Sequence, residues 1–142
     1  MKNSSYPLWL TIVSAFFIVW NFMGLFNFYA QMTISDQDLY NMPAAEQTVY
    51  TSYPLWAAIA FGVAVIAGFL GCIALLFRKK AANLLLQFSL VGVLVQMYHS
   101  LFIANALDVY GPGHVVMSIM IIGFAVLLVW LSSLATKEGW IK

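Results

Sequence analysis

Residues 54–82 read PLWAAIAFGVAVIAGFLGCIALLFRKKAA, a long run without a charged side chain that ends at Arg78, Lys79 and Lys80. About 20 apolar residues in a helix are enough to cross the ~30 Å hydrocarbon core of a membrane. Lipid offers no partner for backbone N–H and C=O groups, so a run of this kind is expected to be helical. The stretch therefore predicts a membrane-spanning helix that ends at a basic loop.

Runs of the same kind occupy the rest of the chain, and the uncharged stretches are 3–35, 47–77, 81–107 and 109–136. Charged residues make up 8% of the 142 residues, against roughly 25% in soluble domains. We predict an all-α integral membrane protein with four transmembrane helices in an up-down antiparallel bundle. Residues 1–142 are expected to form one domain, with spans near 7–30, 54–77, 82–107 and 115–135.

The charged residues divide between the two ends of the predicted spans. All six basic residues fall at one set of ends: Lys2, Arg78, Lys79, Lys80, Lys137 and Lys142. Four of the five acidic residues fall at the opposite ends: Asp36, Asp38, Glu46 and Asp108. Basic residues in short loops favour the cytoplasmic side of a membrane. We therefore predict a multi-pass protein of the inner (plasma) membrane with both termini in the cytoplasm.

The second predicted span carries a regular series of small residues. Ala60, Ala64, Gly68 and Cys72 lie four residues apart, so they share one face of a helix. Small residues let a neighbouring membrane helix approach closely. No polar side chain lies between Trp56 and Phe77. This face is expected to be a helix-packing surface and to bind no ligand.

Intramembrane polar residues concentrate on the first and third predicted spans. Asn21 lies ~21 Å along its helix from Pro7, and Gln96 and His99 lie ~20–24 Å from Asn83, at 1.5 Å per residue. All three are measured from the cytoplasmic ends of their helices, so they should lie at a similar depth, in the outer half of the bilayer. Asn21, Gln96 and His99 are therefore the predicted ligand-binding residues, since an ionisable residue inside a span suggests a functional site.

A structural role is the alternative for the same residues. Gln96 and His99 could donate interhelical hydrogen bonds to backbone groups or to Asn21, and such bonds contribute ~0.6 kcal/mol on average. His99 also lies close enough to the outer surface to be hydrated. Both interpretations remain open from the sequence.

Several kinds of chemistry are disfavoured by what the spans lack. They contain no Asp, Glu, Lys or Arg, and no Ser–His–acid set, Cys–His pair or CxxC motif. We therefore expect no enzyme and no cofactor. His99 and His114 are the only histidines, and although the thioethers of nearby methionines suit Cu(I), we expect no metal site. The net charge of +1 indicates no nucleic-acid partner.

Three motifs resemble a known family. They are Trp20-Asn21-x-x-Gly24, Tyr50-x-Ser52-x-Pro54-x-Trp56, and Gly68-x-x-Gly71 leading into Leu75-Leu76-Phe77-Arg78-Lys79-Lys80-Ala81. Together they are similar to a family of small bacterial four-span inner-membrane proteins often labelled as sugar transporters or uncharacterised membrane proteins. The likeness covers most of the first two spans and their loop. It implies a membrane bundle and transport of a sugar-like solute.

Two functions are therefore expected. The first is a transporter or binder of an uncharged small solute, working within the lipid bilayer as a homodimer. The second is a non-catalytic accessory, assembly or scaffold subunit that serves an unknown membrane-protein partner. The small-residue series on the second span and the acidic loop over 31–53 support this alternative, because both can contact partners.

Overall fold

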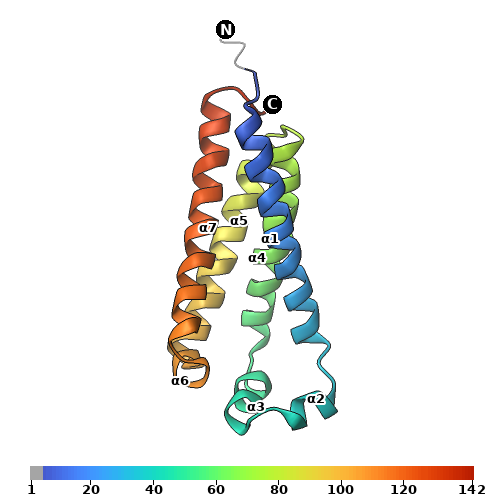
Figure 1. The fold of residues 1–142 in the computed structure, drawn as a ribbon, viewed down its shortest axis with the longest axis vertical. Coiled ribbons are helices and arrows are strands. Elements are labelled where there is room, and N and C mark those ends of the chain that lie inside the picture. The colour runs from blue at the N-terminus through green and yellow to red at the C-terminus, as the bar shows by residue number, and fades with distance from the viewer. Residues whose placement is uncertain (1–4) are drawn as a thin grey trace.

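The computed structural model describes residues 5–142, and four long helices dominate it (Figure 1). Each is long and apolar enough to cross a membrane: α1 (Leu8–Met32), α4 (Leu55–Leu76), α5 (Ala81–Tyr98) with its π-helical extension η1 (His99–Ile103), and α7 (Pro112–Lys137). Three short helices connect them: α2 (Asp36–Asn41), α3 (Ala44–Thr51) and α6 (Ala106–Tyr110). Residues 5–142 contain no strand. An all-helical chain with four helices of spanning length is thus confirmed.

The connection between the third and fourth long helices differs from the sequence prediction. The helix expected to reach residue 107 ends at Ile103, because Asn105 adopts a left-handed conformation with φ of 48°. The fourth helix, expected to begin near residue 115, begins at Pro112. Gly111 has φ of 76°, and proline suits the first turn of a helix. Residues 112–114, expected to precede the fourth span, are therefore the first residues of α7.

The connection from α1 to α4 is ordered by local hydrogen bonds. Ser35 caps α2, since its side chain accepts a hydrogen bond from the Asp38 amide at 3.1 Å. The Gln47 side chain of α3 donates to the backbone carbonyls of Tyr40 at 3.1 Å and Met42 at 2.8 Å. These bonds fold the connection into two short helices beyond the end of α4 (Figure 1).

Helix α4 packs against two of the other long helices, and its small residues allow this close packing. It packs along α1 on one side and α5 on the other, and α5 in turn packs along α7. Ala60, Ala64, Gly68 and Cys72 are all buried. A Cβ atom added to Gly92 of α5 would lie 2.7 Å from the Ala60 carbonyl oxygen, so the two backbones are nearly in contact. The helix-packing face predicted from the sequence is therefore used within the chain itself.

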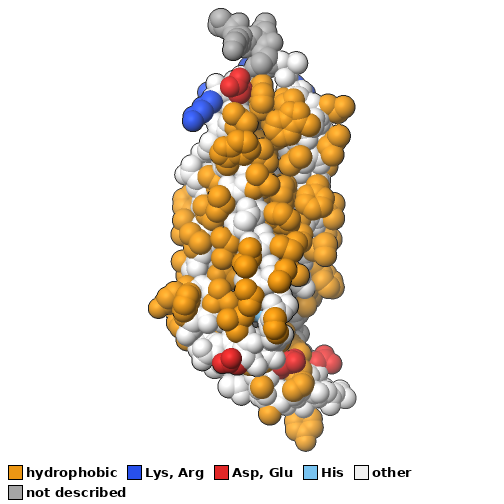
Figure 2. All heavy atoms as spheres, turned by 60° about the vertical axis from the view of Figure 1, so that its left-hand side comes forward, with side chains coloured by type: hydrophobic (Ala, Val, Ile, Leu, Met, Phe, Trp, Pro, Cys, Tyr) orange, Lys and Arg blue, Asp and Glu red, His pale blue; other side chains and the backbone are white. Residues whose placement is uncertain are grey.

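Both described ends of the chain lie at one end of the bundle, together with the basic residues (Figures 1 and 2). The backbone of Lys142 exchanges hydrogen bonds with Arg78 at 2.9 Å and Lys80 at 3.1 Å, and the Arg78 guanidinium lies over the Tyr6 ring at 4.7 Å. Lys2 lies outside the described residues. We call this the basic end and the end that carries α2, α3 and α6 the acidic end. Figure 2 shows an apolar band between them.

Candidate functional site

A cavity of about 290 Å³ opens inside the half of the bundle nearer the acidic end. It is lined from all four long helices: Trp20, Asn21, Met23, Gly24 and Asn27 of α1, Phe61, Ala64 and Val65 of α4, Ser89, Val93, Gln96 and Met97 of α5, and His114, Met117, Ile121, Phe124, Ala125 and Leu128 of α7. Ligand sites typically measure ~300–1,000 Å³, so this cavity has the size of a small-molecule site.

Aromatic rings limit the cavity toward the basic end. The Phe124 ring of α7 packs edge-to-face against Trp20 and Phe17 of α1, with ring centroids 4.9 and 5.2 Å apart. Phe17 is almost fully buried in a cluster with Cys72, Leu86 and Leu128. Between this stack and the basic end, side chains fill the space between α1 and α7. The cavity lies on the other side of the stack, toward the acidic end.

Asn21 lies on the cavity wall, yet its amide is held by the bundle. Its Nδ2 donates to the Phe17 carbonyl at 2.9 Å and to the Cys72 sulfur at 3.5 Å. A Cβ atom at Gly68 would overlap Asn21 Oδ1 and would lie 2.9 Å from Ser89 Oγ. Because residue 68 is glycine, the side chains of Asn21 (α1) and Ser89 (α5) can both lie against the α4 backbone at this position. Asn21 combines a packing role with a place in the site.

Gln96 of α5 is half-buried at the cavity wall and contacts the end of the α3–α4 connection. Its side chain lies near the Tyr53 hydroxyl, which itself donates to the Ala57 carbonyl at 3.3 Å. Burial raises the pKa of Tyr53, and the nearby amides of Gln96 and Gln31 act against this rise. The neutral phenol is thus the form present at ordinary pH. Gln96 links the cavity to the residues that precede α4.

His99 does not line the cavity, so the structure separates it from the other two predicted ligand residues. Its ring is 98% buried between the rings of Tyr53 and Trp56, at centroid distances of 5.1 and 5.3 Å. Among residues 5–142, Nδ1 has no hydrogen-bond partner. His99 shares its neighbour Tyr53 with Gln96, and the next residue, Ser100, lies 3.1 Å from His114, which does line the cavity.

His114 takes the place in the cavity that the sequence analysis gave to His99. Its Nε2 lies 3.1 Å from Ser100 Oγ, and its ring packs against Tyr110 at 5.5 Å. The sequence analysis began the fourth span near residue 115, so residue 114 fell outside it and was not among the predicted ligand-binding residues. A sequence signal for its position does exist. The cavity-lining residues of α7 follow a three- and four-residue spacing that marks one face of a helix: His114, Met117, Ile121, Phe124, Ala125 and Leu128.

The lining contains no acidic side chain, lysine or arginine. Amide groups of Asn21, Asn27 and Gln96, the Ser89 hydroxyl and the His114 imidazole are its polar groups, and no Asp, Glu, Lys or Arg contributes. Residues 5–142 also contain no group of three or more His, Cys, Asp or Glu side chains close enough to share a metal ion. The arrangement can donate and accept hydrogen bonds, and it contains no side chain of fixed charge to pair with a charged ligand.

Comparisons of this chain with models of protein families, with curated proteins and with solved structures found no match.

Proposed function

We propose that this chain is a membrane protein that binds a small uncharged molecule in the cavity between its four long helices. The observation that carries the proposal is the neutral lining, with amide groups among aromatic and aliphatic walls. A charged ligand would lose its hydration without gaining an opposite charge, which is costly in an apolar surrounding. An uncharged solute needs only hydrogen-bond partners and an apolar wall, and the cavity supplies both. Transport of such a solute is the activity that best fits a binding site inside a membrane bundle.

A tryptophan placed inside the cavity tests the proposal. Ile121→Trp on α7 should fill the cavity, whereas Ile119→Trp, whose side chain is 64% exposed on the same helix, adds the same bulk toward lipid. Protein purified in nanodiscs is measured by native mass spectrometry. Wild type and Ile119→Trp should retain an added small-molecule mass, and Ile121→Trp should lose it. Equal retained mass in all three proteins would contradict the proposal.

The accessory-subunit alternative loses one of its two supports. The small residues at positions 60, 64, 68 and 72 are buried against α1 and α5 of the same chain, so they are not free to contact another protein. The acidic connection over residues 33–54 remains available to a partner. Because the cavity is formed within one chain, binding does not require the predicted homodimer, which stays a prediction.

We further propose the orientation of the bundle: an up-down arrangement in the plasma membrane with the basic end in the cytoplasm. The described basic residues gather at one end, and basic residues favour the cytoplasmic side. An impermeant thiol reagent on intact cells should label Asp38→Cys and leave Lys79→Cys unlabelled, in a Cys72→Ala background. The wild-type chain serves as a further control, since Cys72 is fully buried. The reverse labelling would overturn the orientation.

A further inference from the structure

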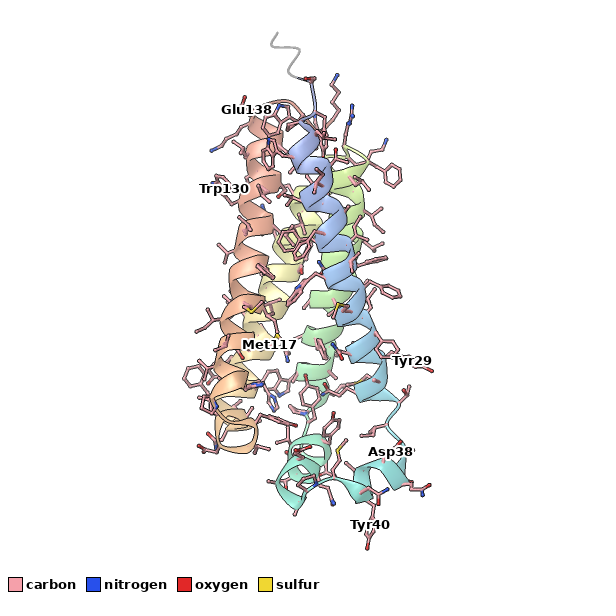
Figure 3. All side chains as sticks on the ribbon, in the orientation of Figure 1. Tyr29, Asp38, Tyr40, Met117, Trp130 and Glu138 are labelled. Atoms are coloured by element: carbon pink, nitrogen blue, oxygen red, sulfur yellow. The ribbon has the colours of Figure 1, made fainter. Side chains whose placement is uncertain are left out.

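We place the mouth of the cavity between α1 and α7, because exposed residues of both helices line it. Helices α1–α4, α4–α5 and α5–α7 pack along each other, whereas α1 and α7 make no comparable backbone contact. In the basic half their gap is filled by the rings of Phe16, Phe17, Trp20 and Phe124. In the acidic half no such stack continues, and α1 and α7 supply the flexible side chains of Met23 and Met117 to the cavity. Met117 is labelled in Figure 3.

Both methionines belong to the mouth and to the outer surface. Met23 is 56% exposed and Met117 is 49% exposed, yet each also lines the cavity. They lie within helices of membrane-spanning length and hydropathy, not in the connections. When the bundle is in a bilayer, acyl chains will surround these positions. Methionine is unbranched and polarizable, and it adapts to apolar partners of varied shape.

Polar groups line both the mouth and the interior of the cavity. Asn27 of α1 and His114 of α7 lie at the gap, whereas Ser89 and Gln96 of α5 and the Asn21 amide line the part on the α4–α5 side. A molecule that enters between Met23 and Met117 would find amide and hydroxyl groups beyond them. Its polar group would lie inside, and its apolar part would remain at the mouth.

We propose that the ligand is a neutral amphiphile that enters sideways from the membrane through the gap between α1 and α7. This inference rests on the proposed function and names the ligand class. The polar head carries hydroxyl or amide groups and no charge, because no Asp, Glu, Lys or Arg lines the cavity to pair with one. The cavity of about 290 Å³ holds the head and the first part of the chain, and the rest of the chain extends between Met23 and Met117 into the bilayer.

The experiment uses a monoacylglycerol with a photoactivatable diazirine in its acyl chain, added to the full-length protein in phosphatidylcholine nanodiscs. Labelled residues are mapped by mass spectrometry. Labelling should concentrate on Met23, Met117 and their cavity neighbours, and unlabelled monoacylglycerol should reduce it at least tenfold. Ile121→Trp should remove this labelling, and the matched variant Ile119→Trp should retain it. A diazirine fatty acid, which carries a carboxylate, should label these residues at least tenfold less.

Other outcomes overturn the inference and separate it from the proposed function. Labelling spread evenly over the lipid-exposed faces of all four helices, unaffected by Ile121→Trp, would exclude a lateral site. Competition by glucose or glycerol but not by unlabelled monoacylglycerol would exclude the amphiphile and leave a cavity for a water-soluble solute. Equal labelling by the fatty acid would exclude selection for a neutral head. In each case the retained-mass comparison of Ile121→Trp with Ile119→Trp still decides the proposed function.

Discussion

The two halves of the bundle use the same four helices and differ at one contact, the one between α1 and α7. In the basic half, Leu10 of α1 packs with Leu131 and Ala135 of α7, all at most 4% exposed, and aromatic rings complete the contact. In the acidic half the residues at the corresponding places are Met23 and Asn27, facing His114 and Met117, and a cavity lies between them. The basic half is a scaffold, and the acidic half contains the site. The side chains at the α1–α7 contact therefore determine which half packs tightly and which half contains the cavity.

Disruption of the α4–α5 contact should have the largest effect, because both halves depend on it. Gly92→Leu should prevent recovery of a monodisperse folded protein, since even a Cβ there would lie 2.7 and 2.8 Å from backbone atoms of Ala60 and Ala64. Gly92→Ala should destabilise the bundle by about 1–3 kcal/mol, as overpacking does. Unfolding in mixed detergent micelles measures the change.

The matched control for position 92 is Gly123 of α7, where an added Cβ has no neighbour within 4 Å. Gly123→Ala and Gly123→Leu should leave stability unchanged or raise it by up to about 1 kcal/mol, because glycine is a poor helix former. Equal losses of stability for the variants at positions 92 and 123 would show that the close contact between α4 and α5 does not limit the size of residue 92.

Removal of the aromatic stack should make the basic half resemble the acidic half. Phe124→Ala removes ring contacts with Phe16, Phe17 and Trp20, and aromatic pairs contribute about 0.5–1.5 kcal/mol each. We expect a loss of about 1–3 kcal/mol in the same unfolding measurement, together with a cavity extended toward the basic end. Phe88→Ala is the control, since Phe88 is 54% exposed on α5. A similar loss for both variants would assign the effect to general helix stability.

The positions of the long helices could be predicted from the sequence because their physical cause is local. Apolar runs of spanning length and the basic loop each depend on neighbouring residues only. The third helix ends four residues before the predicted boundary, since a left-handed Asn105 has weak sequence signals. The fourth helix begins three residues early because Pro112 starts a helix as readily as it forms a turn.

The candidate site was harder to predict because it depends on how far each helix is shifted along its axis and rotated about it. The predicted similar depth is wrong: Asn21 lies level with Gly68 of α4, whereas His99 packs against Trp56, about 18 Å away along α4 at 1.5 Å per residue. Only Asn21 and Gln96 line the cavity. The π-helical geometry that begins at His99 changes the direction of side chains from that residue onward. The position of Asn21 against Cys72 depends on the absence of a side chain at Gly68, which no spacing rule reports.

The smallest expected effect concerns the polar contact behind the cavity. Ser89 Oγ donates to the Ala64 carbonyl across the α4–α5 contact at 2.6 Å, and hydrogen bonds between membrane helices contribute about 0.6 kcal/mol on average. Ser89→Ala should therefore lower the free energy of unfolding by about that amount. Ser118→Ala is a matched control, since Ser118 is also buried. Its hydroxyl donates to the backbone carbonyl of His114 in the preceding turn of its own helix, at 2.8 Å. Because Ser89 lines the cavity and Ser118 does not, only Ser89→Ala should also weaken retention of the bound mass. Loss of stability without any change in retained mass would restrict Ser89 to helix packing and place the ligand's polar group nearer Gln96.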